Sequence, residues 1–226
     1  MVLALLRKEL RETAAFAALA LVAYLVYVSK LMGIGGTFLP ALLSYLPGMS
    51  GPPVEIPFVQ DSFTTLLFLI GAALAIALGF RQSAWEPHQG TALYLLHLPL
   101  SRRTIIATKL LAGVGLLLLC SLLPILMYAV WAATPGTHAG PFEWMMTGSA
   151  FQTWMILPLF YLGAFASGIR PARWFGSRLL PLISVALPAT LCYIVGPWWL
   201  VGLPLLCLTA AVLVSDILWV AGTRDY

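Results

Sequence analysis

Six long apolar runs, separated by short groups of charged residues, constrain this chain more than any other feature. Each run is close to the ~20 residues that a helix needs to cross ~30 Å of hydrocarbon. The runs are continuous rather than alternating, which favours helices over the strands of a barrel. The sequence therefore predicts an all-α integral membrane protein with spans at residues 13–32, 63–80, 105–131, 144–169, 179–195 and 198–221.

The composition agrees with a membrane protein. Hydrophobic residues make up 61% of the chain and charged residues only 9%, whereas soluble domains carry about 25% charged residues. So few charges leave too little polar surface to keep a globule in water. The net charge of +4 is spread in small groups between the apolar runs. We therefore expect contact with membrane lipid and no nucleic-acid partner.

The lysines and arginines predict the orientation. With the N-terminus in the cytoplasm, eleven of the twelve fall on the inner side, and only Lys30 falls outside. Such an imbalance is typical of an even number of spans with both ends inside. We expect a single transmembrane domain over residues 1–226, multi-pass in a bacterial-type inner (plasma) membrane.

Residues 1–12 precede the first predicted span and carry several charges. Leu3, Leu6 and Leu10 share one helical face, and most of the charged residues lie off it. This pattern predicts a short amphipathic helix on the inner leaflet. The alternative is a basic flanking segment that only sets the orientation.

The cytoplasmic loop at residues 81–104 is the longest polar interruption on the charged side. Glu86 and Pro87 suit the first turn of a helix, and Pro99 would end it. The loop is therefore predicted to hold a short amphipathic helix between the second and third spans. It either contacts a partner or simply ties two spans together, and composition alone does not separate these possibilities.

Intramembrane catalysis is not expected. Every histidine lies outside the predicted spans, which argues against a serine protease or a metalloprotease at membrane depth. Cys120, Cys192 and Cys207 lie within spans and lack metal-binding spacing, so we expect buried free thiols. A Walker A sequence is also absent, so ATP would have to be bound by a partner. We expect no catalytic, cofactor or metal site in this chain.

Two features of the spans leave alternatives open. Lys109 and Asp216 fall near the inner ends of their spans, where they either form an ion pair or extend separately to the interface. Gly71, Ala75 and Gly79 form a stripe of small residues that permits close helix contact. That contact is either internal or between two subunits.

The layout and one motif together resemble the ABC type-2 transporter permease family. The motif reads Glu-x-x-x-Gly-Thr, then Leu-Leu-x-x-Pro-x-Ser-Arg, then a lysine seven residues on. The matching positions are Glu86, Gly90, Thr91, Leu95, Leu96, Pro99, Ser101, Arg102 and Lys109. The resemblance covers most of the chain in layout and is residue-specific only over residues 80–119. The chain differs from many family members in having His88 and Gln89 where a second acidic residue is common.

The resemblance implies a function. In that family the loop is a coupling helix, which sits in a groove of a separate ATP-binding subunit. Contact with the ATPase is implied for Glu86, Gly90, Thr91, Tyr94, Leu95 and Arg102. The implied assembly has ATP and Mg in the ATPase and a second permease subunit, identical or similar. We expect an exporter whose substrate the sequence leaves open. The alternative is a non-transporting membrane anchor or scaffold that recruits an ATPase or assembly factor.

Overall fold

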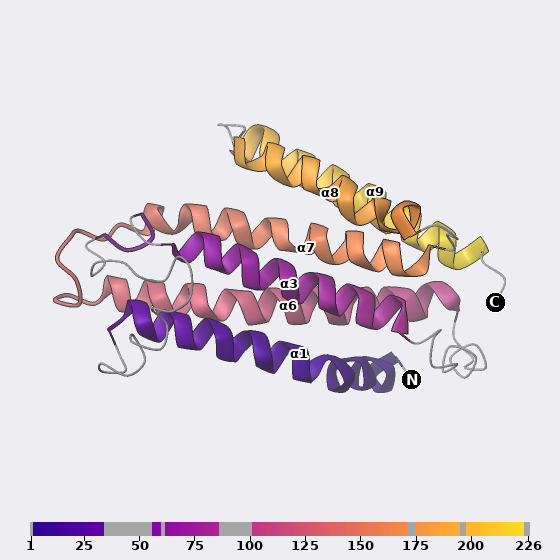
Figure 1. Ribbon diagram of the computed structural model, residues 1–226, viewed down its shortest axis with the longest axis horizontal. Helices are drawn as coiled ribbons and strands as arrows, with labels where there is room; N and C mark the ends of the chain where they lie inside the picture. Colours follow the sequence, from indigo (N-terminus) through magenta and orange to yellow (C-terminus); the bar gives the residue numbers. More distant parts are fainter. Residues whose placement is uncertain are drawn as a thin grey trace. The chain divides into compact units, whose positions relative to one another are not determined.

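A computed structural model describes residues 2–33, 56–59, 62–85, 101–170, 175–194 and 198–223. Long helices dominate this part of the chain (Figure 1). They are α1 (Val2–Leu31), α3 (Phe63–Ser83), α6 (Arg102–Ala133), α7 (Gly148–Ile169), α8 (Phe175–Ile194) and α9 (Leu203–Thr223). A 3-10 turn, η1 (Trp144–Thr147), precedes α7, and a π-helical turn, η2 (Trp198–Gly202), precedes α9.

Six helical segments are long and apolar enough to cross a membrane. They are Val2–Leu31, Phe63–Ser83, Arg102–Ala133, Trp144–Ile169, Gly176–Ile194 and Trp198–Gly222. Each overlaps one of the six runs predicted from the sequence, so the all-α fold with six candidate spans is confirmed. The predicted orientation stays a prediction, and the predicted coupling helix lies outside the described residues.

The start of the chain differs from its prediction. The helix α1 runs without a break from Val2 to Leu31, in place of a separate interfacial helix followed by a span. Its sequence contains neither glycine nor proline, so nothing interrupts its backbone hydrogen bonds. Leu3 and Leu10, which belong to the apolar face predicted to contact the membrane, are exposed. The opposite face is buried, and it carries Glu9.

The chain divides into two compact units, and all four of α1, α3, α6 and α7 contribute to both. Unit 1 comprises Met1–Ala17, Ala72–Leu117 and Ile156–Tyr226, and unit 2 comprises Ala18–Gly71 and Leu118–Met155. Basic residues are distributed very unevenly between the two. Among the described residues, Lys30 is the only lysine or arginine of unit 2, whereas the other nine belong to unit 1.

Aromatic side chains fill the centre of unit 2. Phe58, Phe63 and Tyr128 are all buried, and the ring centroids of Phe58 and Tyr128 lie 4.6 Å apart. The hydroxyl of Tyr24 donates a hydrogen bond to the backbone oxygen of Leu67 at 3.1 Å. Tyrosine is suited to such a core because its hydroxyl finds a partner while its ring packs against apolar neighbours.

Small residues bring α3 and α7 together in unit 1. A Cβ atom at Gly79 would lie 2.8 Å from the backbone oxygen of Tyr161 and 2.7 Å from the Cβ of Ala164. Further along the same pair of helices, Gly168 faces Ser83 with no room for a side chain. Gly79, the last member of the predicted small-residue stripe, therefore makes an internal contact.

The last two helices of unit 1, α8 and α9, pack against each other (Figure 1). Arg178 joins α8 to α7, since its guanidinium donates to the backbone oxygens of Ser167 and Gly168 at 3.4 and 3.3 Å. These carbonyls belong to the last turn of α7, which a positive charge stabilises. Many large side chains exposed on α8 and α9 are apolar. Cys120 and Cys192 are buried as predicted, but Cys207 is exposed on α9.

Candidate functional site

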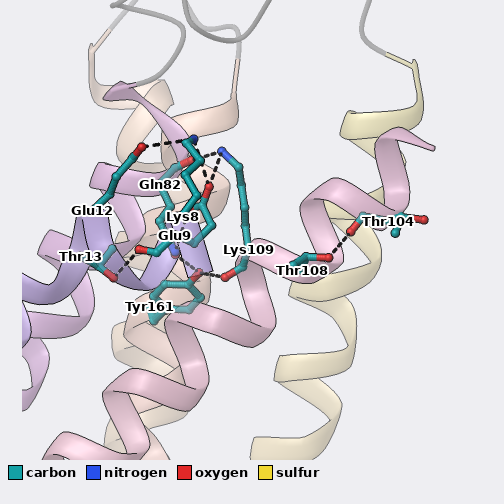
Figure 2. Close-up of polar contacts among 9 residues, drawn as sticks. All are labelled: Lys8, Glu9, Glu12, Thr13, Gln82, Thr104, Thr108, Lys109 and Tyr161. Atoms are coloured by element: carbon teal, nitrogen blue, oxygen red, sulfur yellow. Dashed lines mark hydrogen bonds and ion pairs between the residues drawn. The ribbon is translucent and has the colours of Figure 1, made fainter. Parts of the chain in front are cut away.

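A cluster of buried polar side chains lies where α1, α3, α6 and α7 meet in unit 1 (Figure 2). We call this set the polar cluster: Glu9, Thr13, Gln82, Lys109 and Tyr161. None of the five is more than 3% exposed. Burial of ionisable and amide groups to this extent is costly unless they are paired and hydrogen-bonded. Their contacts therefore decide what the cluster does.

The carboxylate of Glu9 is held from several sides. Its Oε2 accepts a hydrogen bond from Nε2 of Gln82 at 3.2 Å, and its Oε1 lies 3.8 Å from Nζ of Lys109. Nζ of Lys8 lies 3.4 Å from the same Oε1. Two ammonium groups and an amide favour the charged carboxylate and offset the cost of its burial. Glu9 and Lys109 thus form a buried ion pair between α1 and α6.

Gln82 and Lys109 are also linked through Tyr161 of α7. The tyrosine hydroxyl lies 2.6 Å from Oε1 of Gln82 and 3.3 Å from the backbone oxygen of Lys109. Nζ of Lys109 in turn donates to the backbone oxygen of Gln82 at 3.2 Å. Both ends of the Gln82 amide are used, since its oxygen accepts from Tyr161 and its nitrogen donates to Glu9.

The surroundings of the polar cluster leave little room for movement. A Cβ atom at Gly113 would overlap the phenol of Tyr161 and lie 2.5 Å from Oε1 of Gln82. At a partly exposed edge of the cluster, Nζ of Lys8 lies 3.4 Å from Oε1 of Glu12. The two lysines and two glutamates balance in charge, which suits a site built inside a membrane helix bundle.

The site residues predicted from the sequence fall in different places. Lys109 belongs to the polar cluster, where the carboxylate of Glu9 faces it. Asp216 is an exposed residue of α9, and its pair with Lys109 stays a prediction. Arg102 begins α6 and is exposed. The other predicted contacts to an ATPase lie outside the described residues, namely Glu86, Gly90, Thr91, Tyr94 and Leu95.

Sequence reasoning missed four members of the cluster: Glu9, Thr13, Gln82 and Tyr161. One signal was available for Glu9, because Leu5, Glu9 and Thr13 follow one another at intervals of four and so share a helical face. Lys109 gave a second signal, since a lysine within an apolar run needs a partner. Gln82 and Tyr161 carried no comparable signal. In the described part of the chain, no group of three or more His, Cys, Asp or Glu side chains could hold a metal ion.

The six helices make the chain a multi-pass membrane protein by length and composition. In comparisons with protein-family models, with curated proteins and with solved structures, nothing matches this chain.

Proposed function

We propose that this chain is the membrane-spanning permease subunit of an ATP-driven ABC transporter, and that it works as an exporter. Two features of the sequence support the proposal: the motif from Glu86 to Lys109, and six spans with eleven of twelve basic residues on one side. On this proposal the chain has no catalytic site of its own. ATP and Mg are bound by a separate subunit that contacts residues 86–100.

One structural observation carries the proposal. Gln82 precedes Glu86 by four residues, and Lys109 follows Arg102 by seven. The helices α3 and α6 lie on either side of the proposed ATPase contact. The buried contacts of Gln82 and Lys109 connect these two helices to each other, and they connect both to α1 and α7. A membrane subunit driven by a partner needs such contacts, because a loop without them would move by itself and leave the helices in place.

The distribution of charge supports the proposed orientation. Unit 1 contains the start of α1, the end of α3, the start of α6 and the end of α7. These are the helix ends that an N-in topology assigns to the cytoplasm. Nine of the ten described lysines and arginines belong to this unit, in keeping with the positive-inside rule.

The mechanism follows from this attachment. ATP binding draws two ATPase subunits together, and each carries the segment at residues 86–100 of its permease with it. The helices of two permease subunits, identical or similar, then rearrange around a pathway between them. ATP binding can shift the helices toward one arrangement only if it stabilises that arrangement more than the other. Here ATP binding in the partner supplies that difference.

The test is to co-express the chain with a candidate ABC-type ATPase and to purify the complex. Glu86→Ala and Gly90→Pro are expected to lower both the recovery of the ATPase and the ATP hydrolysis of the complex. Glu143→Ala is the matched control, since Glu143 is an exposed acid in the connection between α6 and η1. Undiminished assembly and turnover in both loop variants would remove the assignment.

A second measurement separates transport from anchoring. The complex is placed in lipid vesicles, and movement of a labelled lipid, peptide or drug is followed with and without ATP. Transport of any of these supports the permease. Hydrolysis without movement of any candidate substrate would favour the alternative, a membrane anchor that recruits an ATPase.

A further inference from the structure

Resting on this proposed function, we propose that Glu9 and Tyr161 are positioning residues that pass changes in the spacing of α3 and α6 on to α1 and α7. Glu9 would move α1, and Tyr161 would move α7.

The geometry behind it is a pair of bridges across the same two residues. Glu9 contacts Gln82 through Oε2 at 3.2 Å and Lys109 through Oε1 at 3.8 Å. Tyr161 contacts the same two residues with one hydroxyl, at 2.6 and 3.3 Å. Each bridge therefore joins α3 to α6 and ties both to a third helix, as Figure 2 shows.

Burial makes the bridges stiff. Glu9 is 1% exposed and Tyr161 is fully buried. Water therefore cannot replace a hydrogen bond that breaks when the helices move. A buried polar group left without its partner carries the full penalty of its desolvation. Close contact of Gly113 with Tyr161 and Gln82 removes the space into which the side chains could retreat. Movement of the helices is then less costly than breaking of the contacts.

The two bridges use different atoms of Lys109. Glu9 pairs with the ammonium at the end of the side chain, whereas Tyr161 lies next to the backbone oxygen. Replacement of the lysine side chain therefore cuts the first bridge and leaves the second one intact. This independence gives the inference a specific signature that a general loss of stability would not produce.

The experiment changes the spacing of α3 and α6 directly. Cysteines replace Trp85, which is exposed two residues after the end of α3, and Arg103, which is exposed at the start of α6. The native cysteines of this chain are replaced by alanine. Short and long bis-maleimides then join the two positions in lipid nanodiscs. Amide hydrogen exchange is measured over residues 2–13 of α1 and 161–169 of α7. The response is the ratio of exchange rates between the two tethers.

In the parent, the exchange rates with the two tethers are expected to differ about fivefold in both α1 and α7. A change of this size corresponds to the free energy of one hydrogen bond. In Glu9→Leu/Lys109→Met, which leaves no buried charge unpaired, the response of α1 is lost and that of α7 remains. In Tyr161→Phe the response of α7 is lost and that of α1 remains. Glu12→Gln, at the exposed edge, keeps both responses. A parent without a response overturns the inference, and so does a variant that keeps or loses both together. Tyr161→Phe alone decides the matter if the double variant does not fold.

Failure here and failure of the proposed function are distinguishable. The tethering experiment contains no nucleotide and no partner, so a missing ATPase would remove the permease assignment without changing its result. Loss of the separate responses would remove the two positioning roles and leave the permease assignment intact.

Discussion

Gly113 of α6 packs directly against the hydroxyl of Tyr161 in α7, so that a methyl group at position 113 would overlap the phenol oxygen. The same methyl group would lie 2.5 Å from Oε1 of Gln82. Gly113→Ala is therefore expected to push Tyr161 away from Gln82 and to destabilise the chain by about 1–3 kcal/mol, as overpacking of a core does. The measurement is the thermal unfolding midpoint of the purified protein in lipid nanodiscs.

Gly115 provides the matched control in the same helix. No atom lies within 4 Å of a Cβ built there, so alanine adds no clash and removes the conformational freedom of glycine. Gly115→Ala is expected to leave the unfolding midpoint unchanged or to raise it, since alanine in place of glycine adds up to about 1 kcal/mol to the free energy of unfolding. Equal destabilisation by the two alanines would contradict the close contact between Gly113 and Tyr161.

A second prediction compares two glutamates that lie three residues apart. Glu9 is buried beside Lys109, whereas the carboxylate of Glu12 is about one-third exposed beside Lys8. Glu9→Gln removes the carboxylate that lies 3.8 Å from the buried ammonium of Lys109, and removal of one member of a buried ion pair typically costs about 3–5 kcal/mol. Glu12→Gln removes a surface ion pair worth about 0–1 kcal/mol. The yield of folded protein and its unfolding midpoint should fall sharply only for Glu9→Gln.

A compensating change tests the cause of that loss. Lys109→Met removes the buried ammonium that Glu9 faces, so adding it to Glu9→Gln should recover much of the stability lost in the single variant. Additive losses in the double variant would show that the two side chains do not interact. The stability lost in Glu9→Gln would then have a cause other than the ion pair with Lys109.

The spans were predictable because the thickness of a bilayer sets the length of an apolar helix. The second span begins at Phe63 in the sequence interpretation and in the structure alike, and the fourth extends from Trp144 to Ile169 in both. The first span was the exception. The charges at the start of the chain indicated a separate interfacial helix, but α1 is continuous from Val2. Charge near an apolar run does not by itself end a helix, and α1 contains no glycine or proline that would interrupt it.

The polar cluster was far less accessible from the sequence. The sequence indicates Lys109 as an ionisable residue in a span, either paired with Asp216 or extended to the interface. The structure has Glu9 beside it, a residue 100 positions earlier in the chain. Contacts between helices depend on which faces pack together, and periodicity gives the faces of each helix without giving their neighbours. Tyr161 illustrates the limit, because nothing in its sequence surroundings distinguishes it from an ordinary core tyrosine.

A third prediction concerns the close approach of α3 and α7. A Cβ at Gly79 would lie 2.8 and 2.9 Å from backbone atoms of Tyr161 and Phe165. Backbone atoms cannot turn aside as a flexible side chain can, so Gly79→Ala should separate the two helices and lower the unfolding midpoint by the equivalent of about 1–3 kcal/mol. Gly148→Ala, at the open start of α7, should cost nothing. A silent Gly79→Ala would show that this stretch of α3 does not approach α7 as closely.

The fourth prediction tests the orientation in the membrane. In the proposed N-in orientation, the connection between α6 and η1 lies outside and the start of α6 lies inside. Single cysteines at Arg103 and Ala139, both exposed, are introduced into a chain with its native cysteines replaced. A membrane-impermeant maleimide should label Ala139→Cys in right-side-out vesicles and Arg103→Cys in inside-out vesicles.

Opposite labelling follows from the positive-inside rule. Nine of the ten described lysines and arginines, Arg103 among them, lie at or near helix ends that an N-in topology assigns to the cytoplasm. Permeabilised vesicles, in which both cysteines should react, control for accessibility. Labelling of Arg103→Cys from the outside would put the start of α6, and with it the proposed ATPase contact, on the side without ATP. The permease assignment would then be untenable, while the buried contacts between Glu9, Gln82, Lys109 and Tyr161 would still need a different explanation.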